Sequence, residues 1–211
     1  MFTRKGFIQT AAALTALAML TGCSAKEPGT ASPTPNQPGS SAASPNQPST
    51  SNGTDLSGAP PVKTPLNAAK FYADPCLTLT QAQLQSFNVS SNPRRLDSDH
   101  GVGCAWNFGA DGGVSAGVNF PKPEKGLSLL YANKKDGTYR DGYFDETNVS
   151  GYPAIQYDSN DLRPDGDCTV AVGISDNLYL SVILQGPPGS DGCKRAMNVA
   201  KDVIATIQGG Q

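Results

Sequence analysis

The chain has 211 residues, of which 37% are hydrophobic and 16% are charged, and its formal net charge is −2. Loss of an N-terminal leader containing Arg4 and Lys5 would leave 14 basic and 18 acidic residues, a net charge near −4. This acidic balance, without a cluster of Lys and Arg, argues against a nucleic-acid-binding protein. The arginine doublet Arg94-Arg95 is expected in a solvated loop.

Residues 1–22 have the anatomy of a bacterial signal peptide. Arg4 and Lys5 precede an apolar run over residues 7–20, which is about 14 residues and about 21 Å long as a helix. A bilayer core needs roughly 20 apolar residues, so a permanent transmembrane helix is not expected. The run ends in Leu20-Thr21-Gly22-Cys23, the pattern of a lipobox.

The lipobox predicts that Cys23 becomes the lipidated first residue of the mature protein. Diacylglycerol on Cys23 and an N-acyl chain such as palmitate would give two or three chains, enough for stable anchoring to the cell membrane on its extracytoplasmic face. The alternative is an ordinary cleaved signal in which Cys23 is incidental. Export by the general secretory route and by the twin-arginine route both remain open, because Arg4-Lys5 departs from a twin-arginine pair by one residue.

Residues 23–64 have the composition of a disordered tether. Pro, Ser, Gly, Thr, Asn and Gln dominate, and Pro35-Asn36-Gln37-Pro38 recurs as Pro45-Asn46-Gln47-Pro48. Such a segment cannot bury enough apolar surface to offset its ordering entropy. About 40 residues of this kind average roughly 35 Å from end to end. We therefore expect a spacer that separates the folded domain from the membrane.

Residues 65–208 are predicted to form one domain with two disulfides. Its four cysteines are Cys76, Cys104, Cys168 and Cys193, and an even count in an exported domain indicates disulfide bonds. Of the three connectivities that four cysteines allow, we choose the two local closures, Cys76–Cys104 and Cys168–Cys193. A zinc site is the alternative, but the sequence has no C-x-x-C pair and only one histidine, so no metal is expected.

The predicted elements alternate between hairpins and helices. Thr80 and Gln83 form a capping-box pattern for a short helix ending near residue 87. Alternating apolar residues predict strands over residues 104–108 and 114–120, joined by a turn at 111–113. A helix is expected over residues 124–132, and a turn with a strand over 151–157, after a region that we leave unassigned.

The C-terminal part gives the clearest signals. Residues 168–174 and 179–184 predict a hairpin around Asp176-Asn177, and residues 193–207 carry one apolar stripe of a helix. Cys168 in the strand and Cys193 in the first helical turn are placed to join the two. Together these elements predict an α+β domain, an antiparallel sheet with helices packed on one face.

A known family shares this arrangement. The order Asp74-Pro75-Cys76, Gly103-Cys104-Ala105-Trp106, Gly151-Tyr152-Pro153-Ala154, Cys168-Thr169-Val170 and Cys193 resembles the actinobacterial lipoproteins grouped as domain-of-unknown-function-3558. The resemblance implies an envelope lipoprotein and supplies no catalytic residue. A looser likeness to the two-disulfide sensor domains of mycobacterial receptor kinases would imply an extracytoplasmic binding role.

Two polar clusters resemble sites but lack the residues that such sites need. His100 lies among Asp97, Ser98 and Asp99 without a nucleophile in an elbow motif, so a solvated loop histidine is expected. Residues 158–167 hold several Asp and Asn side chains that invite a calcium interpretation. Leu162 and Arg163 occupy two positions where an EF-hand loop needs a ligand and a glycine, so an acidic connection between strands is the preferred interpretation.

The middle of the domain is rich in tyrosine, whose ring and hydroxyl suit ligand clefts and partner surfaces. Half-buried sheets also use such residues. If the domain has a binding surface, we expect it to include Tyr131, Tyr139, Tyr143, Tyr152 and Tyr157.

These observations predict a non-enzymatic binding domain for a small ligand or an envelope protein, with no catalytic residue and no cofactor. Two alternatives remain open. One is an envelope enzyme that uses a carboxylate acid and base, for which Asp145 and Glu146 are the nominees. The other is a structural or assembly lipoprotein.

Overall fold

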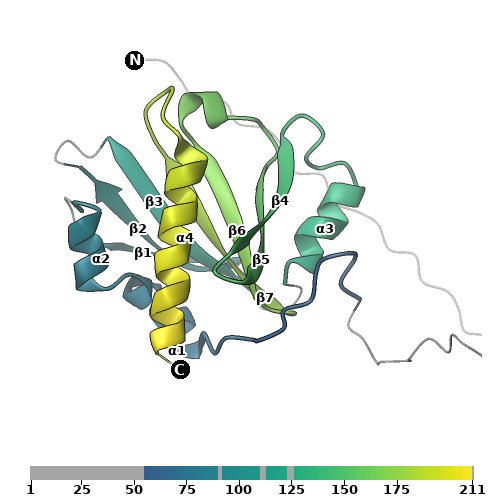
Figure 1. Ribbon diagram of the computed structural model, residues 1–211, viewed down its shortest axis with the longest axis horizontal. Helices are drawn as coiled ribbons and strands as arrows, with labels where there is room; N and C mark the ends of the chain where they lie inside the picture. Colours follow the sequence, from purple (N-terminus) through teal and green to yellow (C-terminus); the bar gives the residue numbers. More distant parts are fainter. Residues whose placement is uncertain (1–54, 90–91, 110–112, 123–125, 211) are drawn as a thin grey trace, which may run out of the picture. The chain divides into compact units, whose positions relative to one another are not determined.

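The computed structural model describes residues 55–89, 92–109, 113–122 and 126–210. Seven strands in these residues form one antiparallel sheet in the order β1-β2-β3-β7-β6-β5-β4 (Figure 1). The strands are β1 (Arg94–Ser98), β2 (Gly101–Phe108), β3 (Val114–Pro121), β4 (Tyr143–Val149), β5 (Tyr152–Asp158), β6 (Cys168–Ser175) and β7 (Leu178–Gln185). The helices are α1 (Ala69–Ala73), α2 (Gln81–Ser86), α3 (Ser128–Lys135) and α4 (Gly192–Gly209), with 3₁₀ turns at η1 (Pro75–Thr78) and η2 (Arg163–Asp165).

The C-terminal helix α4 covers one face of the sheet, which we call the α4 face. Asp191 caps the helix by accepting a hydrogen bond from the Lys194 backbone N–H at 2.9 Å. The predicted apolar stripe is buried against β6 and β7, with α1, α2 and η1 beside it in the same core. Phe120, Val170, Leu180 and Ile204 are fully buried there. This core is the main source of hydrophobic stabilisation.

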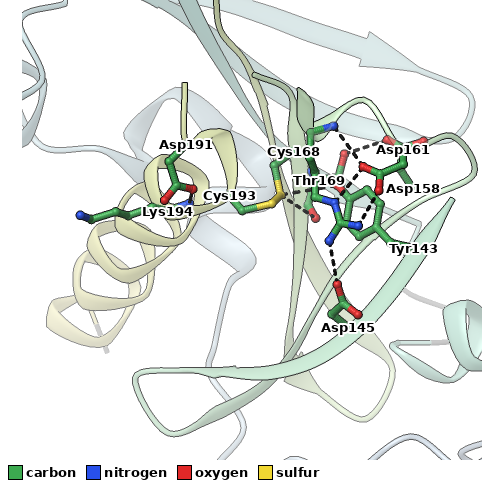
Figure 2. The surroundings of a disulfide bond; sticks show 10 residues. Tyr143, Asp145, Asp158, Asp161, Cys168, Thr169, Asp191, Cys193 and Lys194 are labelled. Atoms are coloured by element: carbon green, nitrogen blue, oxygen red, sulfur yellow. Dashed lines mark hydrogen bonds and ion pairs between the residues drawn. A yellow bond between two sulfur atoms is a disulfide. The ribbon is translucent and has the colours of Figure 1, made fainter. Parts of the chain in front are cut away.

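Both predicted disulfides are present, and each joins an N-terminal turn of a helix to the sheet. Cys76 in η1 is bonded to Cys104 in β2, and Cys168 in β6 is bonded to Cys193 in the first turn of α4 (Figure 2). The α+β class, the antiparallel sheet and the cysteine pairing predicted from the sequence are therefore confirmed.

The short helix α3 packs on the opposite face of the sheet, which we call the α3 face. Leu127, Leu130 and Tyr131 contact Ile155 and Ala171 there in a second, smaller core. The sequence predicted helices on one face of the sheet only. Helices α1, α2 and α4 lie on that face, whereas α3 covers part of the other. The reason is strand alternation, because neighbouring residues of β5 and β6 point to opposite faces and both sets are apolar.

Ordered packing begins before the predicted boundary at residue 65. Ala59 and Val62, which the sequence placed in the tether, are 6% and 7% exposed and belong to the two cores. The Val62 backbone N–H donates to Asp176 Oδ1 in the β6–β7 turn at 2.8 Å. The predicted signal peptide, Cys23 and the predicted tether up to residue 54 lie outside the described residues.

Two edge strands differ from the sequence expectation. Arg94 and Arg95 lie in β1 and not in a loop, paired with Ala105 and Cys104 of β2. The unassigned region before Gly151 contains β4, whose exposed Asp145 and Glu146 had weakened the strand signal. None of the described helices is long and apolar enough to span a membrane.

Candidate functional site

Helix α3 covers only part of its face, and the part over β1, β2, β3 and β7 carries small and polar side chains. We call this area the open face. Strand register places the following residues on it: Arg94, Leu96, Gly103, Ala105, Asn107, Ser115, Gly117, Asn119, Ile183 and Gln185. Ile183 on β7 lies opposite Gly117 of β3, with 43% of its surface exposed. A single exposed aliphatic side chain is common on protein surfaces, so Ile183 points to a contact surface only together with the small and polar residues around it.

Two adjoining depressions follow the open face. The first, the Ile183 groove, has a volume of about 410 Å³ and runs over β1, β2, β3 and β7. The second, the His100 cleft, has a volume of about 600 Å³ and lies where the β1–β2 turn, the end of β3 and α3 meet. Leu96 and Asn119 line both depressions. Volumes of this size are within the range of small-molecule sites.

Two glycines and one amide define the floor between the depressions. A Cβ on Gly103 would lie 2.3 Å from Asn119 Oδ1, so the Asn119 side chain lies directly over Gly103. A Cβ on Gly117 would meet only two atoms at ordinary contact distance, Asn119 Nδ2 at 3.5 Å and the Cys104 carbonyl oxygen at 3.9 Å. No hydrogen bond joins the Asn119 side-chain amide to any other described residue. One donor group and one acceptor are therefore presented to a ligand from the centre of the open face.

The two depressions differ in charge. In the Ile183 groove, Arg94 at the outer strand is the one charged residue among the described lining residues. The His100 cleft has Asp97, His100 and Lys122 on its rim. The Asp97 carboxylate is already bound by Arg95, whose Nε lies 2.9 Å from Oδ2. The Ile183 groove is thus polar and close to neutral, whereas the rim of the His100 cleft carries both acidic and basic side chains.

The tyrosines nominated from the sequence do not form one surface. Tyr131, Tyr139 and Tyr157 lie on the α3 face, where Tyr139 contacts Tyr157 with ring centroids 5.6 Å apart. Tyr143 and Tyr152 belong to the core of the α4 face. Alternation along β5 places Tyr152 and Tyr157 on opposite sides of the sheet. Three of them come together, and two do not.

The tyrosine cluster on the α3 face is packing material with buried hydroxyls. Burial raises the pKa of Tyr131 to about 12 and that of Tyr179 to about 12. Burial also raises the pKa of Tyr157 well above its ordinary value. The Tyr131 ring meets Phe144 edge-on at 5.1 Å, and the Lys134 ammonium lies 4.3 Å from the Phe144 ring centroid. Apart from Tyr179, which lines the His100 cleft, these residues do not reach the open face.

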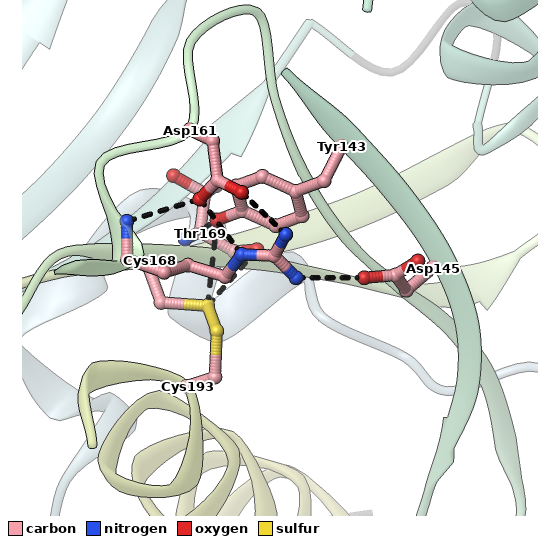
Figure 3. Close-up of polar contacts among 7 residues, drawn as sticks. Tyr143, Asp145, Asp161, Cys168, Thr169 and Cys193 are labelled. Atoms are coloured by element: carbon pink, nitrogen blue, oxygen red, sulfur yellow. Dashed lines mark hydrogen bonds and ion pairs between the residues drawn. A yellow bond between two sulfur atoms is a disulfide. The ribbon is translucent and has the colours of Figure 1, made fainter.

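Tyr143 has a structural role beside the second disulfide. Its hydroxyl accepts a hydrogen bond from the Thr169 backbone N–H at 3.3 Å and lies 3.5 Å from Cys168 Sγ (Figure 3). The Arg163 guanidinium lies over its ring, 4.0 Å from the centroid. Burial raises the Tyr143 pKa. The residue therefore connects the η2 loop, β6 and the disulfide (Figure 2).

The acidic loop before β6 is organised around one arginine. Arg163 binds Asp161 through both Nε and Nη2, and its Nη1 lies 3.0 Å from Asp145 Oδ2 (Figure 3). Hydrogen bonds from Arg163 lower the pKa of Asp161. Within the described part of the chain, no group of three or more His, Cys, Asp or Glu side chains could hold a metal ion. Asp161 in this loop balances the positive charge of Arg163.

The carboxylates nominated for catalysis are not a pair. Asp145 is bound to Arg163, while the neighbouring Glu146 is bound to Lys134 of α3 at 3.2 Å. Consecutive residues of a strand point to opposite faces, so the two groups lie on different sides of β4. Both side chains are more than half exposed. This arrangement gives neither carboxylate the role of an acid or a base toward a shared substrate.

His100 lies in the turn between β1 and β2 and is exposed, as the sequence predicted for a loop histidine. What sequence reasoning missed is that this turn forms the rim of the His100 cleft. A signal was present: β2 and β3 alternate between large residues and the small set Gly103, Ala105, Ser115 and Gly117. Recognising the small set as a site requires knowing which half of the sheet α3 covers, and that is a long-range property.

Comparison with protein families gives one match. A family model described as a protein of unknown function, DUF3558, matches residues 18–206. The match agrees with the resemblance drawn from the cysteine framework, whereas the likeness to receptor-kinase sensor domains stays a prediction. Neither the curated proteins nor the solved structures give a significant match.

Proposed function

The chain belongs to the DUF3558 family, and from this premise we propose that it is a lipid-anchored cell-envelope protein whose domain binds a ligand or an envelope partner through the open face. The proposal has two parts, anchoring and binding. They rest on different observations and can be tested separately.

Three features support anchoring on the extracytoplasmic side of the cell membrane. The leader ends in Leu20-Thr21-Gly22-Cys23, and the following segment has the composition of a tether. Both disulfides suit an oxidising compartment, because thiols are kept reduced in the cytosol. A tether of about 30 residues, ending near residue 54, would let the domain sample roughly 30 Å around its anchor.

The open face is the observation that carries the binding part. An antiparallel sheet commonly packs one face on the core and leaves polar side chains on the other, solvated face. Here the solvated part has glycine, alanine, serine and amide side chains around a 43% exposed Ile183. Two depressions of about 410 and 600 Å³ lie along it. Small floor residues allow a ligand to approach the backbone closely.

An enzymatic role is the second candidate, and the described residues favour it less. Asp145 and Glu146 have separate cationic partners on opposite sides of β4. A structural or assembly role would use the domain surface without a defined site. Variants of the open face separate that role from binding.

The anchoring part is tested by metabolic labelling with a radioactive fatty acid. We expect label on the wild-type protein and none on Cys23→Ala, and globomycin should cause the unprocessed precursor to accumulate. Cys193→Ala is not a suitable control, because it breaks a disulfide, so Ser24→Ala serves as the matched variant. A Cys23→Ala protein that is processed and membrane-bound like the wild type would overturn the anchoring part.

The binding part is tested by photo-cross-linking in intact cells. A photoreactive amino acid at position 183 on the open face is compared with one at position 198, which is exposed on α4 on the other side of the sheet. We expect a discrete adduct from position 183 and none of the same size from position 198. Absence of any adduct from position 183 would contradict binding through the open face.

A further inference from the structure

We propose that the ligand of the Ile183 groove is a short, neutral saccharide segment. This inference rests on the proposed binding role of the open face and names the chemistry of its ligand. It follows from the hydrogen-bonding groups, the charge and the shape of the groove.

The polar groups of the groove are amides and a hydroxyl. Asn119 and Gln185 lie on neighbouring strands, and Ser115 Oγ lies 3.4 Å from Gln185 Oε1. A primary amide offers both a donor and an acceptor, and vicinal sugar hydroxyls require both from the same few ångströms. Asn119 is the best placed of these groups, because its amide has no partner among the described residues and is fixed over Gly103.

The charge of the groove excludes strongly ionic ligands. A phosphate or carboxylate ligand is normally held by several cationic groups, often bidentately by arginine. Arg94 alone supplies a charge among the described lining residues, and it lies at the end of the groove in the edge strand β1. A neutral polar ligand therefore matches the centre of the groove.

The shape suits a chain of sugar rings. Gly117 leaves its Cβ position open, and the exposed Ile183 is paired with it across β3 and β7. The flat C–H face of a sugar ring can pack on Ile183 while its hydroxyls reach Asn119. From Ser115 to Asn119 the strand advances about 13 Å at about 3.3 Å per residue, which accommodates two to three rings.

A polypeptide partner fits the groove less well. Protein interfaces concentrate their binding energy in Trp, Tyr and Arg, which fill or form well-packed pockets. The described lining of the groove contains no aromatic residue, and its two large apolar side chains are those of Leu96 and Ile183. A polypeptide is therefore the competing outcome of the test.

The first experiment titrates the purified soluble domain, residues 55–211, with maltotriose and with tri-N-acetylchitotriose, followed by NMR of side-chain amide signals. Before titration, native folding is checked by near-UV circular dichroism and by the signal dispersion of the same spectra. We expect at least one trisaccharide to shift the signals of Asn119 and Gln185 and not that of Asn198 on α4. Asn119→Ala should weaken this binding at least about tenfold, because it removes the hydrogen bonds that the Asn119 amide would make to the ligand. Asn198→Ala is the matched control and should leave it unchanged.

A second variant blocks the groove without removing a polar group. Gly117→Val adds a side chain where the structure has open space, so the domain should fold and lose saccharide binding. If neither trisaccharide shifts the open-face signals, and the adduct formed at position 183 in cells contains no sugar, the saccharide inference is wrong. An adduct that is a polypeptide would leave binding through the open face intact and overturn the ligand class alone.

Discussion

The side-chain amide of Asn119 in β3 lies across Gly103 of the neighbouring strand β2, so that a Cβ on Gly103 would be 2.3 Å from Asn119 Oδ1. The same Cβ would also lie 2.8 Å from the Val118 carbonyl oxygen, which belongs to the backbone and cannot move independently. Gly117, two residues before Asn119, has no contact closer than 3.5 Å. The neighbours of Gly103 leave no room for a side chain, whereas those of Gly117 do.

The two glycines should therefore respond differently to the same substitution. Gly103→Ala forces Asn119 and the β2–β3 backbone apart, and overpacking of this kind costs about 1–3 kcal/mol. Gly117→Ala meets only ordinary contacts and should change the free energy of unfolding by less than about 0.5 kcal/mol. Urea unfolding curves of both variants measure the difference. Equal midpoints would show that the amide does not lie over Gly103.

Much of the fold could be predicted because its signals are local. The capping box at Thr80 and Gln83 forms as expected, with both hydrogen bonds present. The turn at Asp176-Asn177, the two C-terminal strands and the apolar stripe of α4 also depend on neighbours in sequence. The disulfide pairing followed because local closure placed Cys193 in the helix beside Cys168.

The rest depended on contacts between distant segments. Little near Ala59 and Val62 indicates a core, because prolines and polar residues surround them, whereas Val62 bonds to Asp176 in the β6–β7 turn and Ala59 joins the core formed with α3. The five tyrosines were grouped by closeness in sequence, whereas the pleat of β4 and β5 separates them. The open face is defined by what α3 leaves uncovered, which composition cannot reveal.

Removing the second disulfide should destabilise the domain without unfolding it. The bond between Cys168 and Cys193 closes a loop with a sequence separation of 25 residues, for which the loop-entropy model gives about 3.5 kcal/mol. We expect the double variant Cys168→Ala, Cys193→Ala to lose about this much free energy of unfolding. Urea unfolding measures it, and wild type treated with a reducing agent should shift at least as far. An unchanged midpoint would show that the bond does not constrain the unfolded chain.

The buried tyrosines should make the domain sensitive to alkali. Burial raises the pKa of Tyr179 from about 10 in an unfolded chain to about 12 in the folded protein. The folded state therefore holds this proton more tightly, and its contribution to stability is complete below pH 10 and is lost as the pH rises toward 12. Tyr179→Phe should flatten the fall of the unfolding midpoint over this window. Tyr179 ionising near pH 10 in the folded protein would contradict the effect.

The Asp161–Arg163 ion pair should act at the opposite end of the pH scale. Hydrogen bonds from Arg163 lower the Asp161 pKa below its ordinary value of 3.8. A carboxylate with a lowered folded pKa stabilises the protein above its unfolded pKa, and the effect disappears as the pH falls through the folded value. The difference in unfolding midpoint between wild type and Asp161→Asn should thus be present at neutral pH and vanish in acid. Because both side chains are exposed, the difference is expected to be small and to shrink in high salt.

The early start of the folded unit gives the sharpest test of its boundary. A chain beginning at Pro65 lacks Ala59 and Val62, which are buried, and the hydrogen bond from the Val62 N–H to Asp176. A chain beginning at Asp55 keeps them. Full burial of a valine side chain contributes about 1.5–3 kcal/mol, and a hydrogen bond to a charged group adds about 1.5–3 kcal/mol.

The shorter chain should therefore unfold at a lower urea concentration, by an amount corresponding to several kcal/mol. Exchange of amide protons in α3 should also accelerate, because Val62 and Leu127 both pack against Gly173. Lys63→Ala in the longer chain is the control, since Lys63 is exposed in the same segment. Two chains of equal stability would show that the domain begins at residue 65, as composition alone suggests. In that case residues 55–64 would belong to the tether, and the distance over which the anchor holds the open face would be longer by that segment.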